Sequence, residues 1–358
     1  MFIEPFKLIS FNQSRWKNND FSKFFINTDT KDKVQKTNNI LNFLKNMIAK
    51  GEAKIEQSPC IYVLNIQNYK QNVTSIIGSV HYNERNIFIP NENIHQDKLL
   101  EYKKTFDKYK IQVNPLLTFY KGENTISSLT ESTTRYPPKI EADIDGSTYR
   151  LWSIKNPIDL ETIKSSFDSV NKLYIADGHH RFAIFNNMPR KTSTKIMVSV
   201  TDANSICLKS CHKVIVGNIS DNWIQKISKY CILEILDEGD MKNNILINFK
   251  DGPTYKVTFR TEVVQNMSLY YIVNNIIINE VFGIKDVENS VFPLPGTVSF
   301  SDSQRIFELY QNSSAVIFIP SIDVSEFFKI VDNGDKLPPT STWFEPKIID
   351  GFVIMNFG

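Results

Sequence analysis

The sequence predicts an α+β fold with mixed sheets. Short apolar runs that suit strands mix with segments whose apolar residues recur at helical spacing, without the strict alternation of a parallel α/β sheet. At 358 residues the chain is long enough for two modest domains. We expect an N-terminal α+β lobe at residues 1–220 and a smaller C-terminal α+β lobe at residues 221–358.

The first 90 residues should supply several strands and one helix. A strand is predicted at residues 2–10. A helix is predicted at residues 34–50, where apolar residues recur at helical spacing and Gly51 provides a stop signal. Two apolar runs at residues 60–67 and 73–81 predict a pair of β-strands joined by a short polar connection.

The next segment should add a helix, a strand and a hairpin. Residues 98–110 predict a helix, and residues 115–120 form an apolar run that suits a strand. Residues 122–134 are rich in Ser and Thr and predict either a helix or a loop. Residues 142–153 predict a hairpin, because an Asp-Gly turn separates two apolar stretches.

The second half of the chain continues this mixture. The expected strands are at residues 195–200, 203–215, 245–249, 255–261, 315–319 and 351–356, and the expected helices are at residues 221–230, 269–281 and 324–332.

Composition excludes several classes of protein. The chain has 41 basic and 39 acidic side chains and no basic block, which argues against a nucleic-acid binder. The N-terminus lacks the pattern of a signal peptide, and no apolar run is long enough for a membrane span. Four scattered cysteines are too few for a secreted disulfide framework. We therefore expect a cytoplasmic protein.

The stretch at residues 173–190 is the densest in chemistry. A short apolar strand at 173–176 meets an Asp177-Gly178 turn, and a short helix follows. A strand, a tight turn and a helix N-terminus can hold an anion, because the first N–H groups and the helix dipole point into the turn. The candidate side chains of this turn are Asp177, His179, His180 and Arg181. The alternative is a solvated turn whose Asp caps the helix and whose Arg pairs with a carboxylate elsewhere.

A loop at residues 337–347 is too polar for core and is bounded by prolines. Its hydroxyls at Ser341 and Thr342, together with Lys347, would suit contact with an anion. The alternative is a terminal loop pinned by its own aromatic side chains.

Two further candidates are weaker. Glu92 follows a predicted strand at residues 87–89 and would usually be solvated. His212 and Lys213 form a second cationic pair downstream of the central turn. Although Cys207 and Cys211 precede His212, no second Cys/His cluster completes a zinc site, so no metal site is expected in the protein. Neither a Gly-rich phosphate loop nor a nucleophile elbow occurs.

Residues 174–181 and 337–347 resemble two signatures of the uncharacterised bacterial and archaeal family called domain of unknown function 1015. The central motif is also similar to the strand–turn–helix of ParB-type proteins, sulfiredoxin and ADP-dependent free serine kinases, which holds nucleotide phosphates. This resemblance implies a ParB/sulfiredoxin-like core in which Gly178, His179, His180 and Arg181 contact phosphate. Sulfiredoxin chemistry is excluded, because His179 stands where that protein has its reactive cysteine.

The resemblance also implies roles for individual residues. Asp177 and His180 would handle a proton or stabilise a transition state, as in the kinase branch. The family's Arg-His-Glu-x-Thr-like motif aligns with residues 90–94, where only Glu92 survives as a general base. The family's Ala-Pro-Pro-Tyr-Asp-like motif has no counterpart in residues 1–50.

The leading hypothesis is a phosphotransfer enzyme of the free-serine-kinase type that uses ADP or ATP, with Mg²⁺, on a small hydroxyl metabolite. His179, Arg181 and the helix N-terminus would bind phosphates, with His212 and Lys213 as further cations. Ser341, Thr342 and Lys347 would close the cleft as the loop returns to it. The alternatives are a phosphatase on a metabolite such as phosphoserine, a non-catalytic nucleotide-binding protein, and a relic that binds nothing. No oligomeric state follows from the sequence.

Overall fold

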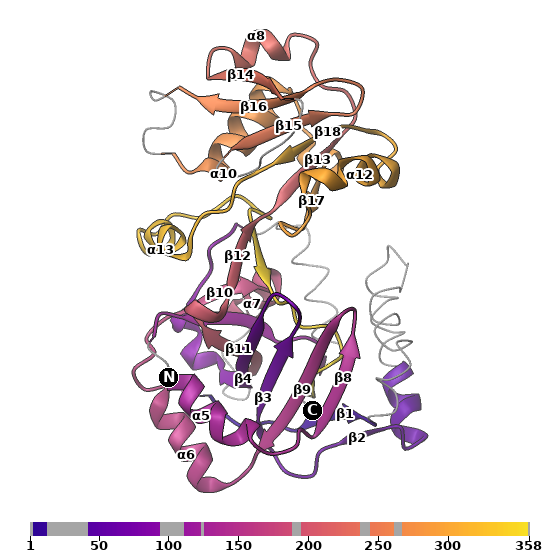
Figure 1. The fold of residues 1–358 in the computed structure, drawn as a ribbon. Helices are drawn as coiled ribbons and strands as arrows, with labels where there is room; N and C mark the ends of the chain where they lie inside the picture. The colour runs from indigo at the N-terminus through magenta and orange to yellow at the C-terminus, as the bar shows by residue number, and fades with distance from the viewer. Residues whose placement is uncertain are drawn as a thin grey trace. The chain divides into compact units, whose positions relative to one another are not determined.

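The computed structural model describes residues 3–12, 42–93, 111–122, 125–187, 195–236, 244–260 and 267–356 (Figure 1). The chain divides into two compact units. Unit 1 comprises Met1–Pro90, Ile94–Ile206 and Pro346–Gly358, and unit 2 comprises Asn91–Asn93 and Cys207–Glu345.

Each unit mixes helices with sheets, so the α+β class is confirmed. The chain passes from unit 1 to unit 2 at 206/207 and returns to unit 1 at residue 346. The boundary between two folding lobes that the sequence predicts at 220/221 stays a prediction. Within the described residues, no helix is long and apolar enough to cross a membrane.

Unit 1 is built on an eight-stranded mixed sheet with the order β5-β10-β7-β11-β4-β3-β9-β8. Strand β7 is parallel to β11 and antiparallel to β10, while β10 is parallel to β5. The strands are β3 (Ile61–Gln67), β4 (Asn72–His81), β5 (Phe88–Ile89), β7 (Leu116–Tyr120), β8 (Ile140–Ile144), β9 (Ser147–Ile154), β10 (Leu173–Asp177) and β11 (Lys195–Asp202).

Both hairpins expected in this sheet are present. Strands β3 and β4 pair antiparallel, with Gln67 opposite Asn72. Strands β8 and β9 pair around the Asp145-Gly146 turn, whose two residues have φ of 48° and 76°. Positive φ at both central residues gives a turn whose twist matches that of the strands, which is why Asp-Gly is favoured there.

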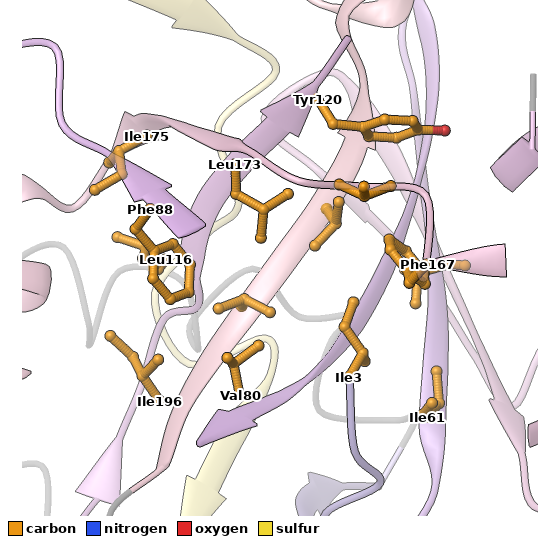
Figure 2. Close-up of a cluster of buried hydrophobic side chains, with 14 of the residues drawn as sticks. Ile3, Ile61, Val80, Phe88, Leu116, Tyr120, Phe167, Leu173, Ile175 and Ile196 are labelled. Atoms are coloured by element: carbon orange, nitrogen blue, oxygen red, sulfur yellow. The ribbon is translucent and has the colours of Figure 1, made fainter. Parts of the chain in front are cut away.

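The core of unit 1 forms between this sheet and the helices that pack on it (Figure 2). Helix α7 (His179–Asn186) is held by two aromatic contacts, Phe182 against Phe88 at 5.2 Å and Phe185 against Tyr82 at 5.5 Å between ring centroids. Burial of each phenylalanine stabilises the fold by about 1.5–3 kcal/mol. The helix that follows the central turn is therefore fixed to the sheet.

The rest of unit 1 contains a smaller sheet and further helices. The sheet has the order β2-β1-β20-β6 and is antiparallel throughout. Its strands are β1 (Leu8–Phe11), β2 (Ala53–Ile55), β6 (Ile111–Gln112) and β20 (Ile354–Asn356), and the helices are α5 (Thr125–Thr134), α6 (Pro157–Ser166) and the 3₁₀ turns η1 (Tyr82–Ile87) and η2 (Ala203–Ser205).

These elements answer several predictions. The first strand begins later than expected, because residues 4 and 6 make only isolated bridges. Residues 122–134 were expected to form either a helix or a loop, and they contain helix α5. Of the helix predicted at 34–50, residues 42–49 are helical and 34–41 lie outside the described residues, as does the helix predicted at 98–110.

Unit 2 is built on a six-stranded antiparallel sheet with the order β14-β16-β15-β18-β13-β17 and a separate pair, β12 and β19. The strands are β12 (Cys207–Ser210), β13 (His212–Val216), β14 (Cys231–Leu236), β15 (Ile245–Phe249), β16 (Thr254–Phe259), β17 (Val291–Leu294), β18 (Ser313–Phe318) and β19 (Thr342–Glu345). The helices are α8 (Trp223–Ile227), α10 (Leu269–Tyr271) with its π-helical continuation η3 (Ile272–Val281), α11 (Val287–Ser290), η4 (Phe300–Asp302), α12 (Ser303–Leu309) and α13 (Val324–Asp332).

Several strands of unit 2 differ from the prediction. The single strand expected at 203–215 is two strands, because the chain changes from one sheet to another at Cys211. The polar loop at 337–347 contains β19, which pairs with β12. Strand β14 was not predicted: it lies at the edge of its sheet, where half of its residues stay exposed and the apolar pattern is weak.

Candidate functional site

The turn between β10 and α7 has an unusual backbone. The register between β10 and β7 shifts between Ile175 and Asp177, which marks a β-bulge at the end of the strand. Bulges re-aim side chains and are common beside functional sites. Gly178 follows with φ of 101° in the left-handed region, and α7 begins at the next residue.

Only glycine fits at this turn. A Cβ added to Gly178 would lie 2.7 Å from Arg181 Nε and 2.9 Å from Leu116 Cδ1, closer than carbon atoms approach such groups in proteins. The positive φ adds strain for any other residue. The sequence therefore places glycine where the backbone must pass close to the Arg181 side chain.

Three of the predicted site residues meet here. Arg181 donates from a terminal guanidinium nitrogen to Asp177 Oδ2 at 2.7 Å. The Lys347 ammonium lies 3.4 Å from Asp177 Oδ1. The side chains of Asp177, Arg181 and Lys347 are 38%, 26% and 39% exposed, so all three remain accessible to a ligand. We call these three residues the charge cluster.

Two neighbours position the cations of the charge cluster. The second terminal nitrogen of Arg181 donates to the Asn114 carbonyl at 3.2 Å, and the Asn114 amide donates to the Ile348 carbonyl at 3.1 Å. The Tyr149 hydroxyl donates to the Lys347 carbonyl at 3.2 Å. Asn114 therefore links the chain beside Lys347 to the guanidinium. The sequence did not indicate it, because its contacts are far apart along the chain.

The charge cluster keeps Asp177 ionised. Partial burial of its carboxyl group favours the neutral form, but the charges of Arg181, Lys347 and His179 outweigh that effect, so its pKa lies below the ordinary 3.8. A carboxylate with a lowered pKa is a weak base. Asp177 is better suited to holding cations than to removing a proton.

The two histidines of the turn begin α7. His179 is buried, and His180 is half-buried. The α7 N-terminus carries the positive end of the helix dipole, which favours negative charge beside these residues. Gly178, His179, His180, Asp177, Arg181 and Lys347 thus all lie within unit 1.

The other predicted site residues lie in unit 2, where Glu92 contacts the 340–342 loop. Its carboxylate accepts from the Ser341 and Thr342 backbone N–H groups and from the Thr342 hydroxyl. The Ser341 hydroxyl is buried and donates to the Pro338 carbonyl at 2.7 Å. Both hydroxyls expected to contact an anion are therefore engaged within unit 2.

The cationic pair at 212–213 does not supply two charges. His212 is 2% exposed, and its Nδ1 accepts from the Ile319 N–H at 3.1 Å. Burial, together with the positive charges of Lys209 and Lys213, lowers its pKa to about 4, so the imidazole is neutral at pH 7. Lys213 is equally buried and donates to Thr340. A buried, neutral imidazole does not offer a positive charge to a phosphate.

No metal site is preformed in the part of the chain that the structure describes. There, no group of three or more His, Cys, Asp or Glu side chains is placed to hold a metal ion. Cys211 is buried and donates to the Leu294 carbonyl at 3.3 Å.

Comparison with known proteins identifies the family. A family model described as a protein of unknown function, DUF1015, matches residues 21–278. The chain belongs to this family. The family expected from the two motifs is confirmed, with residues 174–181 inside the matched range and residues 337–347 beyond it. No curated protein matches the chain.

Solved structures with a similar arrangement are distant in sequence. A C-terminally truncated SbnI from Staphylococcus aureus is 12% identical, with a TM-score of 0.42 over 76% of this chain and 85% of that chain. A free serine kinase variant in complex with AMP is 11% identical, with a TM-score of 0.43 over 77% and 92%. A conserved hypothetical protein from Pyrococcus furiosus is 12% identical, with a TM-score of 0.43 over 79% and 96%. Similarity at this level says nothing about the reaction.

Proposed function

We propose that this DUF1015 protein binds a nucleotide by its phosphates at the β10–α7 turn and transfers a phosphoryl group between that nucleotide and a small hydroxyl metabolite. One observation supports the proposal above all. The charge cluster presents two accessible cations, Arg181 and Lys347, beside the N-terminus of helix α7.

The electrostatics of the cluster suit a phosphate. With Asp177 ionised, the two cations leave a net positive charge, and the α7 dipole adds to it. Arg181 offers a planar fork that matches phosphate oxygens, while Lys347 is a mobile point charge. The Lys347 ammonium lies 3.4 Å from Asp177 Oδ1, which is long for a hydrogen bond.

Phosphoryl transfer needs positioning and charge stabilisation more than covalent chemistry by the protein. Asp177 would hold Arg181 and Lys347 in place and offer one carboxylate to a magnesium ion. A Mg²⁺ ion usually binds through one or two carboxylates together with substrate phosphates, and one carboxylate is what the charge cluster contains. When bound, the ion would neutralise phosphate charge. His179 and His180 would contact the phosphates from the start of α7.

Glu92 favours a second candidate function, nucleotide binding without transfer. Its carboxylate accepts four hydrogen bonds from the 340–342 loop, so it is engaged elsewhere rather than free to act as a general base. Binding without transfer predicts that ADP raises thermal stability while no product forms. Phosphatase activity on a metabolite such as phosphoserine would use the same groups to transfer the phosphoryl group to water, which releases inorganic phosphate and the alcohol.

A product assay tests the proposal. The protein is incubated with ADP or ATP, Mg²⁺ and a panel of hydroxyl metabolites that begins with serine, and phosphorylated product is measured. Phosphoserine alone is the parallel substrate, with inorganic phosphate as its product. We expect turnover that Asp177→Asn abolishes and that Arg150→Ala, at an exposed ion pair of unit 1, leaves unchanged. Turnover that survives Asp177→Asn would contradict the mechanism.

A further inference from the structure

The 340–342 loop of unit 2 gathers donors around one carboxylate. Three consecutive backbone N–H groups point at Glu92: that of Thr340 lies 2.9 Å from Oε2, and those of Ser341 and Thr342 each lie 3.2 Å from Oε1. The Thr342 hydroxyl donates to Oε1 at 2.9 Å. Four donors therefore converge on two oxygen atoms.

Convergence of this kind requires a curled backbone. Thr340 has φ of 56°, in the left-handed region that a β-branched residue rarely adopts. Successive N–H groups in such a curl form a concave nest, which is an anion-binding arrangement of the main chain. A left-handed threonine costs about 1–3 kcal/mol, so the surrounding contacts must hold it in place.

A buried cation lies behind the nest. Lys213 is only 2% exposed, and its ammonium donates to the Thr340 carbonyl at 2.7 Å and to the Thr340 hydroxyl at 2.9 Å. Burial lowers the pKa of Lys213, while the charge of Glu92 is among the influences that raise it. An ammonium taken out of water needs a nearby anion. The nest thus combines N–H donors with a positive charge on its inner side.

The occupant of the nest comes from a short separate segment. Asn91–Asn93 belongs to unit 2, whereas the residues on both sides of it belong to unit 1. It is held by two backbone bonds with Leu337, from Leu337 N–H to the Asn91 carbonyl at 2.7 Å and from Asn93 N–H to the Leu337 carbonyl at 3.4 Å. The segment at 91–93, and not the 340–342 loop, therefore positions the Glu92 side chain in the nest.

We propose that the 340–342 nest, backed by Lys213, is an oxyanion site that Glu92 occupies in the resting protein, and that a phosphate group of a ligand replaces the carboxylate there. A phosphate monoester carries more negative charge than a carboxylate and offers three oxygens to the four donors. The displaced Glu92 regains its hydration. The site lies within unit 2 and does not depend on the nucleotide site proposed at Asp177 and Arg181.

Occupation of the nest by the Glu92 carboxylate should weaken the binding of phosphate by a measurable factor. If the carboxylate fills the nest about nine-tenths of the time, the apparent Kd for phosphate is raised about tenfold. Glu92→Ala empties the nest, so it should bind phosphate about tenfold more tightly than the parent protein.

The experiment measures thermal stability in titrations of inorganic phosphate, phosphoserine and ADP, with chloride keeping the ionic strength constant. All variants carry Arg181→Ala, which removes the proposed phosphate site of unit 1. Glu92→Ala is compared with Glu234→Ala, which removes an exposed carboxylate of unit 2 that pairs with Lys256. We expect a saturable stabilisation of Glu92→Ala that Lys213→Met abolishes. The ligand with the lowest Kd then identifies the source of the phosphate.

A second variant covers the case in which Glu92→Ala does not fold. Glu92→Gln keeps the shape of the side chain but removes its charge. It also replaces one acceptor oxygen with an NH₂ group, which cannot accept a hydrogen bond from the nest. It should respond to phosphate more strongly than the parent and survive as a folded protein. If neither variant responds more strongly than Glu234→Ala, Glu92 is a fixed structural anchor and the proposal is wrong.

Discussion

Arg181 reaches back along the β10–α7 turn and places its guanidinium 2.7 Å from the Asp177 carboxylate. The two residues are four apart, so the pair closes the turn like the i,i+4 pairs of a helix surface, although Asp177 still belongs to the strand. Gly178 lies under the guanidinium and has no side chain to obstruct it. The geometry of the turn therefore depends on both the pair and the glycine.

Gly178→Ala should destabilise the protein and weaken nucleotide binding. Its Cβ would require Arg181 to move, in addition to the strain of positive φ, for a combined cost of about 2–4 kcal/mol. Chemical denaturation measures the free energy of unfolding, and calorimetric titration measures ADP affinity.

Gly146→Ala is the matched control. Gly146 also has positive φ, at 76°, but nothing lies within 4 Å of the added Cβ. Gly146→Ala should lower the free energy of unfolding only by the cost of positive φ, about 1–2 kcal/mol, and should keep the ADP affinity of the parent protein. Equal losses of stability and affinity in the two variants would show that contact with Arg181 does not matter.

Asp177→Asn should separate binding from turnover. Removing the carboxylate leaves Arg181 and Lys347 without its competing negative charge, so ADP should bind at least as tightly in the absence of Mg²⁺. Turnover should disappear, because the variant no longer offers a carboxylate to Mg²⁺. Loss of ADP binding in this variant would mean that Asp177 is needed to build the site.

Acid should destabilise unit 2 through His212. Its folded-state pKa of about 4 lies below the ordinary 6.5, so the unfolded chain binds a proton first as the pH falls. The stability linked to His212 is complete above about pH 6.5 and is lost toward pH 4, by about 3 kcal/mol.

His212→Asn isolates this effect, because its amide oxygen can still accept from the Ile319 N–H but does not titrate. Carboxylates contribute equally to the two proteins and cancel in the difference of unfolding free energies. That difference should shrink by about 3 kcal/mol between pH 7 and pH 4. A difference that is independent of pH would show that the histidine titrates normally when folded.

The sequence predicts the local parts of the site well. The turn at Asp177-Gly178 and the Asp145-Gly146 hairpin depend on backbone preferences of neighbouring residues, which any reader of the chain can recognise. The strand and helix on either side of Asp177 follow from their short-range apolar pattern.

Contacts between distant residues escape such reasoning. Glu92 meets Thr340 across 248 positions, and Arg181 meets the Asn114 carbonyl across 67. No local pattern marks these partners. The sequence suggests His212 and Lys213 as phosphate-binding cations, but both lie in a strand between two others, where the sheet buries them. Burial of polar residues is decided by tertiary packing rather than by composition.

We propose above all that nucleotide phosphates bind at the charge cluster. The most direct measurement is a calorimetric titration of ADP, with and without Mg²⁺, into the parent protein, Arg181→Ala and the control Arg150→Ala. The proposal predicts saturable binding by the parent and by Arg150→Ala, weakened at least tenfold in Arg181→Ala, since a charged hydrogen bond is worth about 1.5–3 kcal/mol. Equal ADP affinity in all three proteins, or none in the parent, would contradict it.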